Sequence, residues 1–232
     1  MELRTYTDII TKLNNDYDLT DENFISETEL LGYLNEAIDD AEAIVHNLHH
    51  EDKYFLTRST FSWVSGTQDY ALPTDIYSNK IRVINYNDGT EKYEIRRLKD
   101  LKKIPFLEAT DPYQYLIINT TASGVRARFY PTPAITNSTY VEIWYIRNML
   151  RMTTSAASTN VCEVPESVNF IYQHCKKNIA KKMRRPDLIA QEESDLKMQY
   201  DLLLSNLKDM TADDNTVMEM DLSSYWEQQG GF

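Results

Sequence analysis

The chain has 232 residues, enough to bury a sizeable core. Its 42% hydrophobic and 26% charged residues are close to the usage of globular proteins, which excludes a largely disordered chain. No apolar run approaches the length of a membrane-spanning helix, so we expect no membrane partner.

The formal net charge of −12 is concentrated in one segment. Residues 13–52 hold twelve Asp and Glu and no Lys or Arg, and the other 24 acids equal the 24 Lys and Arg of the chain. Such a segment repels a polyanion such as DNA, so this face is not expected to grip nucleic acid.

The acidic segment contains a long predicted helix. Ser26 and Glu29 have the spacing of a capping box, and the apolar residues from Leu30 onward recur at intervals of three and four as far as about His50. A shorter helix is predicted over residues 5–14, with Ile9, Ile10 and Leu13 buried. Four acids should project from the face of the long helix opposite its apolar stripe: Glu29, Glu36, Asp39 and Asp40.

Residues 55–147 change to short runs rich in Tyr, Ile, Val, Thr and Trp, which predicts antiparallel strands. One hairpin is predicted around Asn87-Asp88-Gly89-Thr90, where Asp-Gly supplies positive φ angles, with strands over residues 81–86 and 92–98. A second is predicted from 115–119 to 125–129, where apolar residues alternate with Arg126 and Arg128. Tyr130-Pro131-Thr132-Pro133 should end the second hairpin.

Helix returns after Pro165, with an apolar stripe that includes Ile171, Cys175 and Ile179, and Pro186 separates it from a further helix over residues 187–208. The sequence after Met210 is acidic and polar without periodicity, which predicts a tail with no core of its own. Six apolar side chains of this end of the chain are costly to leave in water and are candidate partner contacts: Met218, Met220, Leu222, Tyr225, Trp226 and Phe232.

We therefore predict an α+β fold: a helical bundle from the N- and C-terminal helices, an inserted antiparallel β-domain and an extended C-terminal tail. The expected divisions are N-terminal helices over 1–53, a β-domain over 54–160, a helical hairpin over 161–210 and the tail over 211–232. The only cysteines are Cys162 and Cys175, and the N-terminus lacks the apolar core of a signal peptide, so we expect free thiols in a reducing cytoplasm.

Candidate catalytic and cofactor sites are sparse. His46 and His50 have the spacing of two metal ligands on one helix face, but histidine near a helix C-terminus is also favourable against the helix dipole. His174 adjoins Cys175, but adjacent helical residues point about 100° apart and Cys175 belongs to the apolar stripe. No Walker loop or dinucleotide fingerprint is present, and the sixteen tyrosines favour packing or interfaces over base stacking. We expect no enzyme activity, cofactor or metal.

A basic ridge is the strongest competing signal. Six basic residues lie between positions 176 and 185, and four of them form the candidate ridge: Lys177, Lys181, Arg184 and Arg185. The ridge could bind DNA in a packaging factor, or be a solvated face paired with acids such as Glu192 and Glu193. It could also meet the acidic helix of a neighbouring subunit, as a heterologous ring interface requires.

Four short segments follow one another in the order Tyr33-Leu34-Asn35-Glu36-Ala37, Gly66-Thr67-Gln68-Asp69-Tyr70-Ala71-Leu72-Pro73, Tyr130-Pro131-Thr132-Pro133 and Val164-Pro165. Together they resemble the head-to-tail adaptor, or neck ring, proteins of tailed phages, particularly the tail accessory factors of podoviruses. The resemblance implies a helical bundle with an inserted β-domain, a ring of twelve copies and docking on the portal protein through the C-terminal segment. It implies a place in the virion, assembly in the host cytoplasm and contact with other neck or tail proteins. DNA would be only passing cargo, and the acidic helix would face the lumen or a basic neighbour.

Overall fold

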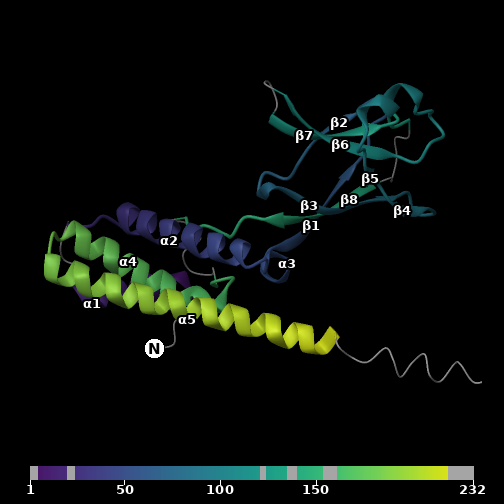
Figure 1. The fold of residues 1–232 in the computed structure, drawn as a ribbon. Coiled ribbons are helices and arrows are strands. Elements are labelled where there is room, and N and C mark those ends of the chain that lie inside the picture. Colours follow the sequence, from purple (N-terminus) through teal and green to yellow (C-terminus); the bar gives the residue numbers. More distant parts are fainter. Residues whose placement is uncertain (1–4, 20–23, 121–123, 135–139, 154–160, 219–232) are drawn as a thin grey trace, which may run out of the picture. The chain divides into compact units, whose positions relative to one another are not determined.

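The computed structural model describes residues 5–19, 24–120, 124–134, 140–153 and 161–218. The chain divides into two compact units, a helical unit from Met1–His50 and Met149–Phe232 and a β unit over Glu51–Asn148. Both kinds of secondary structure are present, so the predicted mixed α+β class is confirmed. Figure 1 shows the elements of each unit.

The helical unit begins with α1 (Tyr6–Tyr17) and α2 (Glu27–Asn47). The full capping box belongs to α1: Asp8 N donates to Thr5 Oγ1 at 3.1 Å and Thr5 N donates to Asp8 Oδ2 at 2.9 Å. On α2 only half of the predicted box forms. Glu29 N donates to Ser26 Oγ, while the Glu29 carboxylate accepts from Tyr33 and Lys182.

The predicted apolar stripe of α2 is buried from Leu30 to Val45, and Leu48 is half-buried. The helix ends at Asn47, three residues before the predicted end, because His49 has a φ of +60°.

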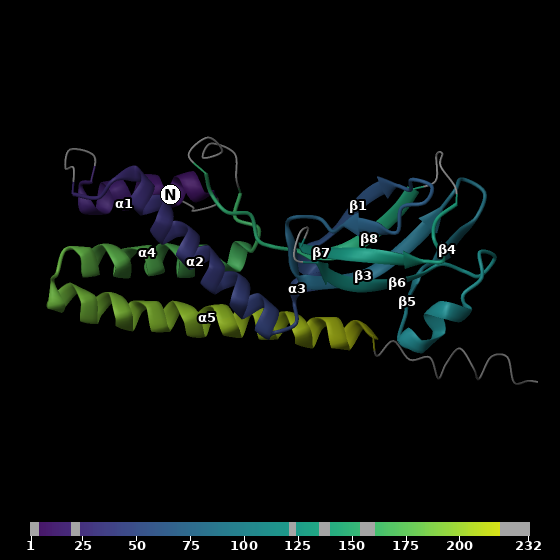
Figure 2. The ribbon, with the colours of Figure 1, turned by 90° about the horizontal axis from the view of Figure 1, so that it is seen from above.

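The C-terminal half of the helical unit contains the 3₁₀ turn η2 (Pro165–Ser167), α4 (Val168–Lys182) and α5 (Pro186–Met218). Figures 1 and 2 show α4 and α5 side by side. The buried stripe of α4 includes Ile171, Cys175 and Ile179, as predicted, and packs against α2 and α5. On α5, Leu203 and Leu207 are buried, whereas Tyr200 is exposed.

The end predicted for the last helix is wrong. The backbone stays helical through Met218 and not merely to residue 208, so residues 211–218 are not extended. No Gly or Pro occurs between Pro186 and Met218, so the backbone meets no strong helix breaker after the last buried leucine.

The β unit starts with the short helix α3 (Glu51–Tyr54) and contains two four-stranded sheets. One has the order β1 (Leu56–Ser62), β8 (Tyr140–Arg147), β3 (Ile76–Asn87), β4 (Lys92–Glu94). The other has the order β2 (Asp69–Ala71), β7 (Gly124–Tyr130), β6 (Gln114–Thr120), β5 (Arg96–Arg97). A 3₁₀ helix, η1 (Leu101–Phe106), lies between β5 and β6 in the sequence.

Both predicted hairpins form. Strands β3 and β4 pair with Asn87 opposite Lys92, and β6 and β7 pair with Tyr115 opposite Phe129. In the first turn only Gly89 takes a positive φ, of +90°, while Asp88 instead accepts backbone hydrogen bonds from Thr90 and Glu91. The Asp88 part of the predicted turn chemistry is therefore corrected.

The β unit is not purely antiparallel as predicted. After Glu94 the chain leaves the first sheet, and Arg96–Arg97 pair in parallel with β6 of the second sheet. Ile95, only 1% exposed, lies at this crossing and donates its N–H to Ile84 O at 2.7 Å. The run over residues 92–98 therefore does not continue as a single strand, because its two halves pair with different sheets.

Side chains from both sheets form one core, which explains the alternating patterns of their strands. Val141, Ile143 and Tyr145 come from β8, and Ala127 and Phe129 come from β7. Trp63 packs edge-on against Phe129 with ring centroids 5.5 Å apart. The aromatic richness of residues 55–147 therefore serves the packing of this core.

Candidate interaction surfaces

The acidic residues of α2 lie against other segments of the same chain. Lys182 Nζ of α4 lies 2.7 Å from Glu29 Oε1, and Asn178 Nδ2 donates to Glu36 Oε2 at 3.0 Å. The hydrogen bond from Lys182, followed by that from Tyr33, lowers the pKa of the Glu29 carboxyl. The surface predicted for the lumen or a neighbouring subunit is thus partly engaged inside the chain.

The other two predicted acids are also paired. Arg151, which follows the β unit, places its Nη2 2.8 Å from Asp39 Oδ1, and His174 Nε2 lies 3.0 Å from Asp40 Oδ2. The side chains of Asp39 and Asp40 remain 44% and 57% exposed, so each keeps solvent access on one side. The sequence contained both partners, but only tertiary packing brings them to α2.

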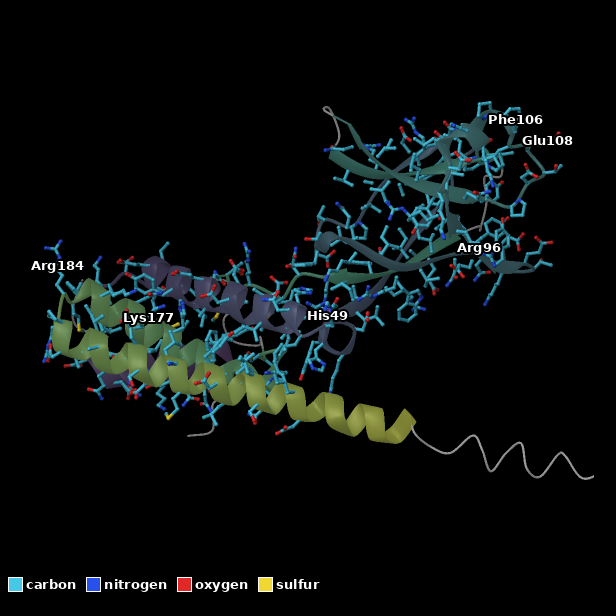
Figure 3. All side chains as sticks on the ribbon, in the orientation of Figure 1. His49, Arg96, Phe106, Glu108, Lys177 and Arg184 are labelled. Carbon is cyan, nitrogen blue, oxygen red and sulfur yellow. The ribbon has the colours of Figure 1, made fainter. Side chains whose placement is uncertain are left out.

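The basic ridge is likewise partly neutralised within the chain. Lys181 pairs with Glu193 at 3.6 Å, and Arg185 pairs with Asp187 at 2.8 Å. Arg184 is exposed at the turn between α4 and α5, where its φ is +54°, and Figure 3 shows it at that end of the helical unit. These pairs favour the interpretation of a solvated helix face over that of a DNA-binding ridge.

Glu192 of α5 contacts both α1 and α4, and it is the most buried of the acids near the basic ridge. It is 4% exposed, and it accepts hydrogen bonds from Tyr17 Oη of α1 and from Gln173 Nε2 of α4. Lys176 Nζ lies 3.1 Å from its Oε2. This carboxylate holds α1, α4 and α5 together through charged hydrogen bonds.

The histidine and cysteine residues that were weaker candidates for metal binding or catalysis lie in packed parts of the fold. His46 Nε2 lies 3.9 Å from the buried Glu42, and within the described residues no group of three or more His, Cys, Asp or Glu is arranged to hold a metal. Cys175 and Cys162 are free and buried, and burial raises the pKa of both thiols, which opposes formation of the thiolate. Cys175 is a core residue of α4, as its sequence position suggested.

A groove with a volume of about 510 Å³ lies among α2, α4 and α5. Its lining combines apolar side chains, three lysines, two carboxylates and a histidine. The residues are Asp40, Ile44, Phe170, His174, Lys177, Lys181, Glu193, Leu196, Lys197 and Tyr200. Lys177 of the predicted ridge therefore lies at a concave surface, and Figure 3 shows its position on α4. The sequence alone did not indicate this groove, because its lining comes from three helices.

The β unit carries an exposed apolar surface that sequence reasoning missed. Leu101 and Phe106 of η1 are 58% and 81% exposed, and Lys102 and Lys103 lie between them in the sequence. Figure 3 marks Phe106. These two side chains are a candidate contact point and not an extended apolar patch. The signal available in the sequence was an apolar run containing Pro105, too short to count as a strand.

The comparison with protein families decides the class of this protein. A family model described as SU10 adaptor protein matches residues 4–220, which is nearly the whole chain. The chain belongs to the SU10 adaptor protein family. This places it among the structural adaptor proteins of bacteriophages, in the virion, with other head or tail proteins as its partners. A search of curated proteins finds no match.

Three of the segments that carried the adaptor resemblance contribute side-chain hydrogen bonds within the chain. The Asn35 side chain donates to Met152 O at 3.0 Å and accepts from Met152 N at 2.8 Å. Gln68 Nε2 donates to Thr132 Oγ1 at 2.7 Å, which joins the second and third segments. These contacts show that Asn35, Gln68 and Thr132 take part in hydrogen bonds within the chain.

The C-terminal candidates of the adaptor lie at the limit of what is described. Met218 is the last residue of α5, and its backbone is helical. Met220, Leu222, Tyr225, Trp226 and Phe232 lie outside the described residues. No helix in the described part of the adaptor has the length and hydrophobicity needed to cross a membrane.

Proposed function

We propose that this chain is a head-to-tail adaptor that forms a ring of twelve copies beneath the portal of a tailed phage. The ring extends the DNA conduit and provides the attachment surface for tail proteins, in the manner of the neck rings of podoviruses. The match to the adaptor family over residues 4–220 carries this proposal.

The division of the chain supports an adaptor with two separate contact regions. One compact unit takes residues from both ends of the chain and the other comprises Glu51–Asn148, a division that is compatible with a helical bundle and an inserted β-domain. Each unit has its own buried core and its own exposed apolar residues. Leu101 and Phe106 lie on the β unit, and Met198 and Leu202 lie on α5.

These exposed apolar residues are better candidates for ring contacts than the paired charges. An exposed ion pair contributes about 0–1 kcal/mol. Charged side chains of α2 and α4 already form such pairs within the chain. Burying a large apolar side chain contributes about 1.5–3 kcal/mol before the cost of association. The same contacts recur around a closed ring, because each subunit uses two different surfaces.

DNA is passing cargo in this proposal, and the adaptor works without catalysis. The net charge of −12 suits a conduit that must not hold DNA tightly. The accessible sides of Asp39 and Asp40 can face the lumen or a neighbouring subunit. Assembly in the host cytoplasm fits the two free thiols of the chain.

Mass measurement of the chain mixed with its portal protein tests the proposal. We expect a complex whose mass corresponds to a portal ring carrying twelve adaptor copies. A mixture that retains only the separate masses of the two proteins under assembly conditions would contradict it. A complex of another stoichiometry would support the adaptor role and change the proposed number of copies in the ring.

A further inference from the structure

The first sheet of the β unit ends in two different edge strands. Its order is β1-β8-β3-β4, so β1 and β4 each have a neighbouring strand on one side only among the described residues. Figure 2 labels the four strands. Each neighbouring pair is antiparallel, so β4 runs opposite to β1. A strand at the edge of a sheet presents unpaired N–H and C=O groups that can bind a further strand.

Strand β1 has a long and regular free edge. Its seven residues pair with β8 without a bulge, and Arg147 N donates to Phe55 O at 3.0 Å. Because backbone groups alternate in direction along a strand, those of Thr57, Ser59 and Phe61 also point to β8. The backbone groups of the alternate residues point away from β8, with no hydrogen bond in the described part of the chain: Leu56, Arg58, Thr60 and Ser62.

Strand β4 presents a short, charged edge. Ile95 N donates to Ile84 O at 2.7 Å, so the backbone groups of Ile95 and Tyr93 point to β3. Those of Lys92 and Glu94 therefore point away from the sheet. Both of these side chains are exposed, and neither forms an ion pair or side-chain hydrogen bond with a described residue. The edge of β4 thus combines free backbone groups with one cation and one anion.

The outward residues of both strands have their side chains on the same face of the sheet. Phe61 of β1 and Tyr93 of β4 pack against the core between the two sheets. The alternate residues, such as Thr60 and Lys92, therefore lie on the opposite face. Residues opposite each other in an antiparallel pair share a face. A second copy in a similar orientation can thus place its β4 beside β1 with both cores on one side.

Charge favours one register for such a pair. Outward residues must face each other, which leaves three positions on β1 for Glu94 if Lys92 is also paired: Leu56, Arg58 and Thr60. In the first register Lys92 lies opposite Arg58, and like charges directly opposite destabilise strand pairing. In the second, Glu94 lies opposite Arg58, so opposite charges meet, and Lys92 lies opposite Thr60. In the third, no charge of β4 lies opposite Arg58.

Arg58 can contact a second carboxylate without leaving its own partners. Its Nη1 lies 3.5 Å from Glu142 Oε2 of the same chain, and its guanidinium carbon lies 5.8 Å from the centroid of the Trp144 ring. The Arg58 side chain is still 58% exposed, and a guanidinium has five N–H donors. Donors therefore remain for a carboxylate that a neighbouring strand supplies.

We propose that β1 of one copy pairs antiparallel with β4 of the next copy, with Arg58 opposite Glu94 and Thr60 opposite Lys92. The two edges are different surfaces of one chain, so the same pairing repeats head to tail, as a closed ring requires. A pairing of β1 with β1 would instead end after two copies. The inference rests on the proposed ring and specifies the contact that joins its neighbouring subunits.

Disulfide cross-linking between two variants of the full-length chain tests this pairing. One variant carries Thr60→Cys and the other carries Lys92→Cys, and the two are oxidised together, both alone at high concentration and with the portal protein. Opposite residues of an antiparallel pair have Cα atoms about 4.5–5.5 Å apart, within the range of a disulfide. We expect a cross-link that joins the two variants. Cross-links only between two Thr60→Cys chains, or none in either mixture, would overturn the inference.

The register has its own control. Ser62→Cys replaces Thr60→Cys in the same mixture and moves the thiol two residues along β1, so its cross-link to Lys92→Cys should form with about tenfold lower yield. The native Cys162 and Cys175 are buried and stay in both variants. Equal yields from positions 60 and 62 would overturn the proposed register.

Reversal of the paired charges adds a second test. Arg58→Glu and, separately, Glu94→Arg place like charges opposite each other, so each should raise the concentration at which copies associate by about tenfold. The double variant restores opposite charges and should associate like the parent chain. Lys99→Glu is the control, because Lys99 is exposed and lies outside both edge strands. A double variant that associates no better than Arg58→Glu would overturn the pairing of these two charges.

Circular dichroism melting checks that each variant folds, and Glu94→Arg is the safer substitution because Glu94 is exposed. The mass measurement with the portal protein separates this inference from the proposed function. A portal complex with twelve copies but no cross-link between positions 60 and 92 would retain the ring and overturn this pairing. Cross-links between copies without a portal complex would retain the pairing and contradict the proposed attachment.

Discussion

Two buried carboxylates join segments of the helical unit that are far apart in the sequence. Glu42 of α2 is 7% exposed and accepts a hydrogen bond from Met149 N at 2.7 Å. Glu192 of α5 is 4% exposed and contacts α1 and α4. A buried carboxylate costs desolvation energy, so each of these residues stabilises the fold only through the partners that it keeps.

Glu42→Gln should fold at least as stably as the parent chain at pH 7. The amide oxygen can still accept from Met149 N, and the substitution removes a charge that burial disfavours. Glu42→Ala leaves that N–H without its acceptor and should lower the free energy of unfolding by about 1–3 kcal/mol. Urea unfolding of both variants checks this, and a loss in Glu42→Gln equal to that in Glu42→Ala would contradict it.

The pH dependence of the Glu42 variants has a definite sign. Burial raises the pKa of the Glu42 carboxyl above its ordinary value of 4.5. The charged form is therefore penalised in the folded state, and this penalty disappears as the pH falls through the raised pKa toward 4.5. The parent chain should gain stability relative to Glu42→Gln on acidification. A constant difference between pH 8 and pH 4.5 would show that Glu42 is not perturbed.

Glu192→Ala should lower the free energy of unfolding by about 3 kcal/mol, because it leaves the half-buried hydroxyl of Tyr17 and the buried amide of Gln173 without their acceptor. Glu193→Ala is the matched control, since its side chain is 53% exposed and forms one exposed pair worth about 0–1 kcal/mol. Chemical denaturation measures both variants. Similar losses at the two adjacent positions would refute the role assigned to Glu192.

At the scale of elements, the contact between α2 and α4 combines an apolar interior with charged edges. The packed stripes hold the two helices together, while Glu29 and Glu36 contact Lys182 and Asn178 at the edges. Partly exposed pairs of this kind are individually weak. The geometry of the helices is therefore set mainly by the stripes.

Reversing Glu36, Asp39 and Asp40 to Lys should leave the chain folded. The buried stripe is untouched, and the lost contacts with Asn178, Arg151 and His174 should lower the free energy of unfolding by about 1–3 kcal/mol in total. Assembly or DNA passage should be impaired if the accessible sides of these acids face the lumen or a neighbour. Thermal unfolding measures the first effect, and the yield of infectious particles measures the second. Full infectivity would remove the proposed role of the acidic face.

At the scale of the whole molecule, each unit has its own core and presents surface residues that its own fold leaves uncovered. Phe106 of the β unit is 81% exposed. Phe106→Ser should change the free energy of unfolding by no more than about 0.5 kcal/mol, because little of the ring is buried. It should weaken the association of adaptor copies or the binding of a partner, seen as a lower mass in native mass spectrometry.

Leu150→Ser is a control for that substitution, because Leu150 is a large apolar side chain that is 50% exposed but belongs to the helical unit. Assembly of Phe106→Ser at the parent mass and concentration dependence would show that η1 is no contact surface. A loss of stability in Phe106→Ser would instead indicate that the aromatic side chain of Phe106 packs against its own β unit.

Local patterns were enough to predict several elements of this chain. Spacings of three and four predicted α2 and α4, because a helix buries residues on one stripe and both stripes are continuous in the sequence. The two hairpins were predictable because strand alternation and the turn residue Gly89 are local signals. The buried, free state of Cys175 followed from its place in the apolar stripe.

The candidate surfaces were less predictable from the sequence. The charges of Asp39 and Lys181 were evident, but their partners Arg151 and Glu193 are chosen by packing between segments. An ion pair depends on distance in space, which a single sequence does not give. The exposure of Phe106 and Leu101 was missed for the same reason, since apolar residues are assigned to a core until the fold shows which are left outside.

The sequence by itself determined the mixed α+β class, the main helices, both hairpins and the resemblance to phage adaptors, because each rests on local periodicity or on short ordered motifs. Only the tertiary structure decided that the chain passes from one sheet to the other at Ile95, and that residues of α2, α4 and α5 line one groove. Both depend on which residues from separate segments pack together, and this is a property of the folded chain.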